Sequence, residues 1–158
     1  MEITAFQIRK TETGELTSRK EFITNLNTDV TPNKLFAKRV YLIAGIYGLI
    51  VLAPQYFLEA KNGQDFPPAI THPEYYYGFV GVGLAWQVAF LVISTDPTRY
   101  RLLMIPTVLE KFSFGIAAAM LFALGRLNPT MMVAGTIDMI LGALFIASYV
   151  ATRPRTGT

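Results

Sequence analysis

The chain has 158 residues, of which 52% are hydrophobic and only 16% are charged, and its mean hydropathy is +0.37. Soluble domains carry about 25% charged residues, so the shortage of charge is the informative feature. With no cysteine and one histidine, the chain alone cannot build a disulfide scaffold, a zinc-thiolate site, an iron–sulfur cluster or a multi-histidine metal centre. The net charge of +3 requires no nucleic-acid partner.

The apolar residues fall into four blocks, at about residues 40–60, 76–95, 102–125 and 131–151. Each block is close to the ~20 residues that a helix needs to cross a hydrocarbon core of ~30 Å. We therefore predict an all-α membrane protein with four transmembrane helices in an antiparallel bundle. This bundle would occupy residues 32–152, between a polar N-terminal tail (residues 1–31) and a short C-terminal tail (residues 153–158). A buried helical bundle in a soluble protein is the alternative.

A proline precedes every block, at Thr31-Pro32, His72-Pro73, Asp96-Pro97 and Asn128-Pro129. Proline is well tolerated at the first position of a helix, and Thr, Asp or Asn before it can cap the next free N–H groups. We expect each helix to begin at this polar cap. Pro54 and Pro106 lie inside or near the ends of spans and predict kinks or local unwinding.

Most of the 14 lysines and arginines lie before the first block, in the second connection or at the C-terminus. The positive-inside rule then places both termini in the cytoplasm, and a bacterial inner membrane is the location we expect. Residues 1–35 show no apolar run behind a basic start, so no cleavable signal peptide is expected. Residues 1–10 alternate weakly, as a short strand would, although a solvated tail is the simpler interpretation.

Polar side chains at membrane depth are the main candidates for a site. Glu110 and Lys111 lie about 12–14 Å into the third block, and Gln87, beside Trp86, should reach nearly the same level from the other side. A charge near the bilayer centre costs roughly 2.5–3.5 kcal/mol, so it needs a partner or a function. We expect a hydrogen bond between Gln87 and Glu110, with Lys111 paired nearby or extended toward the cytoplasm.

Asp138 is a second buried acid, about 10 Å from the outer surface by the same helical rise. Gln55 reaches a similar height on the first span, with Glu59 just above it. These positions predict an outer polar layer (Gln55, Asp138 and Glu59) above a midplane layer (Gln87, Glu110 and Lys111). Together the layers would form a polar path or the floor of an outward-facing pocket.

Each of these residues also has a structural interpretation. Glu110 and Asp138 either titrate protons or bind a ligand, or they only hold helices together. His72 fits an interfacial position within a tyrosine-rich belt, and an axial metal ligand is the alternative. Residues 96–101 fit a capped turn on the positive side of the membrane, and the alternative is that Arg99 and Arg101, beside a helix start, hold an anionic lipid headgroup. The sequence contains none of the common nucleotide, zinc-protease, hydrolase or calcium motifs, and we predict no cofactor and no metal site.

Four short spans with polar residues in their middle resemble the architecture of emopamil-binding and sigma-2 receptor-like proteins, and Trp86–Phe90 can be compared with the glutamine-bearing second span of that family. The resemblance covers this one short motif. The first span here lacks the buried acid of that family, so sterol isomerase chemistry is not carried over. Small multidrug transporters also have four spans, but their essential glutamate lies in the first span, where this chain has only Glu59 at the end.

Three functional hypotheses follow. The first, slightly favoured, is a non-catalytic accessory or structural subunit that contacts membrane lipids and other membrane subunits or copies of itself. The second is a binder of a hydrophobic ligand or lipid, or an enzyme acting on one, with an intramembrane pocket lined by Glu110, Gln87 and Asp138. The third is a small proton-coupled transporter that acts as a homo-oligomer.

Overall fold

The computed structural model describes residues 19 and 31–154, so the predictions for the N-terminal tail lie outside the described residues. These residues form only helices and turns: α2 (Pro32–Leu52), the 3₁₀ helix η1 (Ala53–Phe57), α3 (Glu59–Asp65), α4 (Pro73–Thr95), the 3₁₀ helix η2 (Arg101–Leu103), α5 (Met104–Ala123) and α6 (Pro129–Ala151). Four segments are long and apolar enough to cross a membrane: Pro32–Phe57, Pro73–Thr95, Arg101–Ala123 and Pro129–Ala151. The prediction of an all-helical chain with four candidate membrane spans is confirmed.

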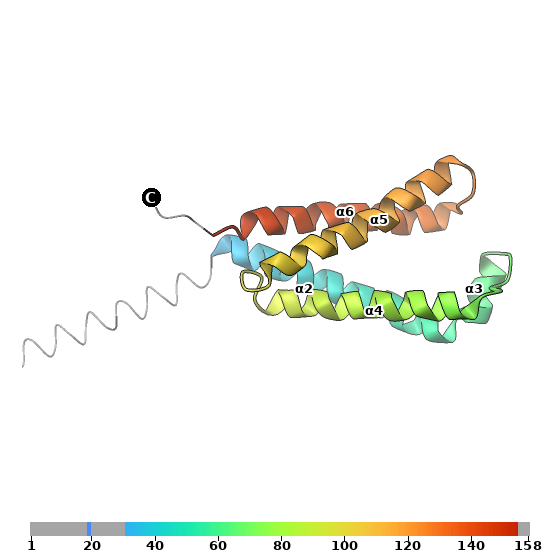
Figure 1. The fold of residues 1–158 in the computed structure, drawn as a ribbon, viewed down its shortest axis with the longest axis horizontal. Coiled ribbons are helices and arrows are strands. Elements are labelled where there is room, and N and C mark those ends of the chain that lie inside the picture. The colour runs from blue at the N-terminus through green and yellow to red at the C-terminus, as the bar shows by residue number, and fades with distance from the viewer. Residues whose placement is uncertain (1–18, 20–30, 155–158) are drawn as a thin grey trace, which may run out of the picture.

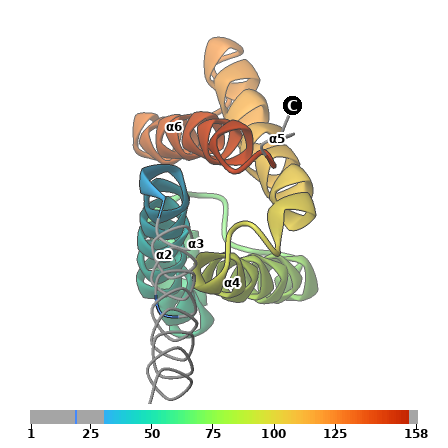
Figure 2. The ribbon, with the colours of Figure 1, turned by 90° about the vertical axis from the view of Figure 1, so that its left-hand side faces the viewer.

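The long helices are arranged as two pairs. Helix α2 lies beside α4, and α5 lies beside α6 (Figure 1). A contact between α2 and α6 joins the pairs, whereas α4 and α5 touch only slightly. The end-on view shows α5 crossing the direction of its neighbours (Figure 2). The helices therefore contact one another unevenly, and the α4–α5 side is the least closed.

Three of the four helix starts follow the predicted proline rule. Pro32, Pro73 and Pro129 each stand in the first turn of a long helix. The Thr31 side chain accepts a hydrogen bond from the Lys34 N–H, and Asn128 accepts one from the Thr130 N–H, as capping residues do.

At Asp96-Pro97 the expected helix start was wrong, whereas the capped turn expected over residues 96–101 is confirmed. The chain turns after Asp96 and passes through η2, and α5 begins only at Met104. The Asp96 carboxylate accepts a hydrogen bond from the Arg99 N–H at 3.4 Å, so it stabilises a turn and not a helix start.

The other two prolines affect the helices differently. Pro54 stands at the change from α2 to the tighter η1, where local unwinding was expected. Pro106 lies in the first turn of α5, where backbone N–H groups have no intrahelical partner, so the absence of an N–H costs no hydrogen bond.

The first long helix begins at Pro32, well before the apolar block, and its α-helical part ends at Leu52.

A small apolar core joins all four long helices near one end. Tyr41 of α2 stacks on Phe145 of α6 at 4.2 Å between ring centroids and meets Phe90 of α4 edge-on at 6.0 Å. Met104 of α5 belongs to the same cluster. Outside it the helices expose many large apolar side chains, as expected for surfaces that meet lipid or other membrane helices.

Candidate functional site

Three ionisable side chains meet between α5 and α6. The Lys111 ammonium donates hydrogen bonds to Glu110 Oε1 at 3.3 Å and to Asp138 Oδ1 at 3.1 Å. The Lys111 side chain is only 8% exposed, against 21% for Glu110 and 17% for Asp138. We call Glu110, Lys111 and Asp138 the charged cluster. It contains one cation and two carboxyl groups and lies within two of the candidate membrane spans.

The packing of α5 on α6 brings the cluster together. Gly115 lies one turn beyond Lys111, and a Cβ there would stand 2.6 Å from Cγ of Met139, the residue next to Asp138. Glycine at this position lets the two backbones approach closely. The Lys111 ammonium also lies 5.4 Å from the centre of the Phe90 ring of α4, where a cation–π attraction adds to the ion pairs.

The expected hydrogen bond between Gln87 and Glu110 is not formed. The Gln87 amide instead donates to the carbonyl of Gly83 on its own helix at 3.0 Å. Its side chain packs against Gly48 of α2, where an added Cβ would overlap it. Glu110 accepts a hydrogen bond from the Lys111 ammonium instead. Within residues 31–154, two buried oxygens, Gln87 Oε1 and Glu110 Oε2, have no hydrogen-bond partner.

The predicted assignment of Asp138 to an outer layer with Gln55 was also wrong. Lys111 and Asp138 lie at similar distances from the connection between α5 and α6, so they meet across the pair at one level. Helical rise alone placed Asp138 too far from Lys111, because it takes no account of how two helices are offset when they pack.

Gln55 and Glu59 lie in a separate network where α2 gives way to η1 and α3. The Asn62 amide donates to Gln55 Oε1 at 2.6 Å, and the Tyr76 hydroxyl donates to the Gln55 carbonyl at 2.7 Å. The Tyr77 hydroxyl donates to Glu59 at 2.7 Å. These bonds tie η1 and α3 to the start of α4.

One deep polar contact was missed by the sequence analysis. Tyr41 and Thr107 share a hydrogen bond of 2.8 Å, and both residues are fully buried. The Thr107 hydroxyl donates to the Met104 carbonyl at 2.7 Å, so Tyr41 is the donor to Thr107. Thr107 lies one helical turn before Lys111, on the same face, which was the signal that could have found it.

The remaining candidates lie apart from the charged cluster. Trp86 packs against the apolar core, and His72 pairs with Glu74 at 3.1 Å in an exposed position. Arg101 donates to the Tyr149 carbonyl at 3.1 Å, and its guanidinium lies 3.7 Å from the Tyr149 ring centre. Within residues 31–154, no group of three His, Asp or Glu residues is placed to hold a metal ion.

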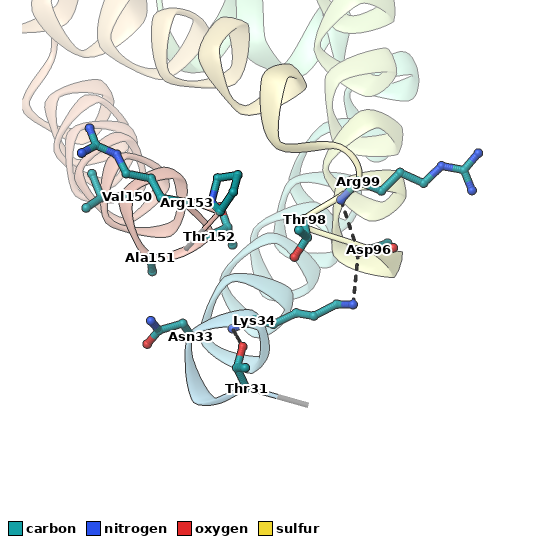
Figure 3. A pocket seen from close by; sticks show the side chains of 11 residues that line it. Thr31, Asn33, Lys34, Asp96, Thr98, Arg99, Val150, Ala151, Thr152 and Arg153 are labelled. Carbon is teal, nitrogen blue, oxygen red and sulfur yellow. Dashed lines mark hydrogen bonds and ion pairs between the residues drawn. The ribbon is translucent and has the colours of Figure 1, made fainter. Parts of the chain in front are cut away.

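A pocket of about 700 Å³ opens where α2 begins, α6 ends and the chain turns after α4 (Figure 3). Lys34 pairs with Asp96 at 3.3 Å, and Thr98, Arg99 and Arg153 also line the pocket. Partial burial raises the pKa of Asp96. A larger opposite effect comes from hydrogen bonds with the Arg99 and Thr98 N–H groups and from the Lys34 ammonium, so the pKa of Asp96 lies below its ordinary value. Arg99 and Arg153 thus stand at the rim of the pocket, with their guanidinium groups pointing outward and away from each other (Figure 3).

No family model, no curated protein and no solved structure matches this chain.

Proposed function

We propose that this chain is a non-catalytic structural subunit of a larger membrane complex. In this proposal the four spans form an antiparallel bundle in a bacterial inner membrane, with both termini in the cytoplasm. One observation carries it: two polar contacts at depth, those of Lys111 and Tyr41, join different helices of the same chain. Lys111 joins α5 to α6, and the Tyr41–Thr107 bond joins α2 to α5.

Two features together support a structural role. The polar groups bond within the chain, and the helices turn apolar side chains outward. Helix α5 exposes Leu109 at 70% and Met120 at 62%, and α4 exposes Val82 at 61%. Helices α4 and α5 touch only slightly, which leaves their sides accessible to lipid or to a helix of another subunit. Membrane helices associate through close packing of such faces together with small residues.

The distribution of cations supports the orientation. Lys34, Arg99 and Arg153 come from three segments of the chain and line one pocket at one end of the molecule (Figure 3). Lys61 and Arg126 belong to the connections at the opposite ends of the helices. Cytoplasmic loops are the ones enriched in lysine and arginine.

Native mass spectrometry of the protein, extracted from its own membrane in a mild detergent, tests the subunit proposal. We expect the chain to appear with one or more other polypeptides in a fixed ratio. The substitution Leu109→Glu, on the exposed face of α5, should reduce that ratio, while Arg126→Gln, in a connection, should leave it unchanged. A chain found only alone or with copies of itself would overturn the proposal.

Orientation can be tested independently because the natural chain contains no cysteine. Thr98→Cys and Arg126→Cys place single thiols in the two connections on either side of α5. A maleimide that cannot cross membranes should label Arg126→Cys in whole cells and Thr98→Cys only after the membrane is opened. The reverse pattern would contradict the orientation.

A second candidate function is the binding of anionic lipid headgroups at the end of the molecule that carries Lys34, and the observation that favours it is that Arg99 and Arg153 extend outward at this same end (Figure 3). Arg101, the other predicted headgroup residue, is already bonded to Tyr149. Vesicles with and without an anionic phospholipid would test it, with Arg99→Gln and Arg153→Gln combined expected to remove any preference for the anionic lipid.

A further inference from the structure

The charged cluster does not balance its charges. Lys111 supplies one positive charge, whereas Glu110 and Asp138 would supply two negative charges if both were ionised. An ionised carboxylate without a countercharge is strongly disfavoured where water is scarce, and such a group binds a proton instead. Two carboxyl groups that share one site do not readily both ionise.

The hydrogen bonds show which oxygen is free to hold that proton. Glu110 Oε1 accepts from Lys111, but Glu110 Oε2 is buried and has no partner in the part of the chain that the structure describes. Asp138 Oδ1 accepts the other, shorter bond from Lys111. We propose that the charged cluster binds one proton per chain inside the membrane, held on Oε2 of Glu110, so that Lys111 and Asp138 form the remaining ion pair.

The groups around Glu110 are consistent with this assignment. On α5 the charged neighbour is Lys111, and on α6 it is Asp138. Helix α4 presents the Phe90 ring to Lys111, and it carries Gln87, which is neutral. Tyr41 of α2 keeps its hydroxyl on Thr107, one turn away from the cluster. Among the residues that the structure describes, Lys111 is therefore the one cation in contact with these two carboxyl groups.

Charge balance predicts how many protonated carboxyl groups each variant holds. The natural chain should hold one at neutral pH, and Glu110→Gln should hold none. Asp138→Asn should also hold none, although Glu110 is still present, because Lys111 then balances Glu110 alone. Lys111→Met should hold two. A purely structural role for Asp138 does not predict that its substitution changes the state of Glu110.

Infrared spectroscopy of the full chain in lipid bilayers counts these groups through the carbonyl stretch of the protonated carboxyl, which separates from the carboxylate bands. Dicyclohexylcarbodiimide, an apolar reagent, provides a second readout. The carboxyl proton moves to a carbodiimide nitrogen and the carboxyl oxygen adds to its carbon, so the adduct retains the whole reagent mass. Peptide mass spectrometry should locate it on Glu110 of the natural chain and find it lost in Asp138→Asn.

Glu59→Gln is the matched control, because Glu59 lies outside the cluster and bonds Tyr77. It should change neither the protonated band nor the adduct at Glu110. A natural chain without a protonated carboxyl at neutral pH would overturn the proposal, whether or not any variant folds. An adduct on Asp138 alone, or a Glu110 adduct that survives Asp138→Asn at full yield, would overturn it as well.

Discussion

The α2–α4 pair and the α5–α6 pair both contain glycines at their contacts, but they differ in chemistry. Between α2 and α4, Gly48 receives the side chain of Gln87, whose amide bonds its own helix. Between α5 and α6, Gly115 brings the helices close and Lys111 bonds Asp138 across the contact. Both contacts thus depend on close packing, and the second depends also on charge, so substitutions that remove charge should affect the α5–α6 pair and not the α2–α4 pair.

The largest effect is expected when the charge between α5 and α6 is removed. Lys111→Met leaves two buried carboxyl groups without their cation, and breaking a buried ion pair in this way costs about 3 kcal/mol of unfolding free energy. The loss stays near the lower end of such values because both carboxyl groups can take up protons. Unfolding by SDS in mixed micelles, followed by helical circular dichroism, measures it.

The control is Lys61→Met, because Lys61 forms an exposed pair with Asp65 within α3. Exposed pairs of this spacing contribute about 0.3–0.5 kcal/mol at most. If Lys111→Met proved as mild as Lys61→Met, the α5–α6 pair would not depend on its charge.

A change of size should disturb the α2–α4 pair next most strongly. Gly48→Ala adds a Cβ that overlaps the buried Gln87 side chain, and such overpacking costs about 1–3 kcal/mol. Gly78→Ala in α4 is the matched control, since no atom outside its own helix lies within 4 Å of an added Cβ. The same unfolding measurement should show Gly48→Ala partly rescued by Gln87→Ala; equal effects of the two alanines would contradict the contact.

A smaller effect is expected where the two pairs are joined. Tyr41→Phe keeps the stacking on Phe145 but removes the hydroxyl that donates to Thr107. Because Thr107 still bonds the Met104 carbonyl, the loss should be about 1 kcal/mol. Tyr75→Phe, at an exposed tyrosine, should leave the unfolding free energy unchanged. A neutral Tyr41→Phe would show that this bond contributes nothing measurable.

The smallest effect belongs to the exposed pair of Lys34 and Asp96. Asp96→Asn should lower the unfolding free energy by less than about 1 kcal/mol, because its side chain is 40% exposed. The folded-state pKa of Asp96 lies below its ordinary value, so its contribution is complete above the unfolded pKa of about 3.9 and disappears as pH falls through the folded pKa. Stability measured between pH 6 and pH 2 should therefore converge for the two chains; a constant difference would contradict the ion pair.

Hydrophobic length was sufficient to predict the four helices, because their apolar blocks match the thickness of a bilayer. Three helix starts followed from Thr31, His72 and Asn128 before proline, whereas Asp96-Pro97 has the same pattern and begins a turn. A local pattern gives the capping chemistry but not the length of chain needed to cross from α4 to α5.

The charged residues at depth were also found from the sequence, but their partners were not. Residue depth placed Gln87 near Glu110, yet Gln87 faces Gly48 of another helix. Rotation about the helix axis and the offset between packed helices decide which side chains meet, and neither quantity is encoded in the spacing along one chain. Whether Glu110 and Asp138 act in function stays a prediction.

The short connection between α5 and α6 has a consequence for how the chain enters the membrane. Alone, α5 would bring the Glu110–Lys111 ion pair into hydrocarbon without a neighbouring helix to shield it, at a cost of several kcal/mol. Asp138 follows within the next helix, so Lys111 can also bond α6 before either helix is released to lipid. Insertion of α5 should thus wait for the synthesis of α6, and a nascent chain that ends before Asp138 should cross the membrane poorly.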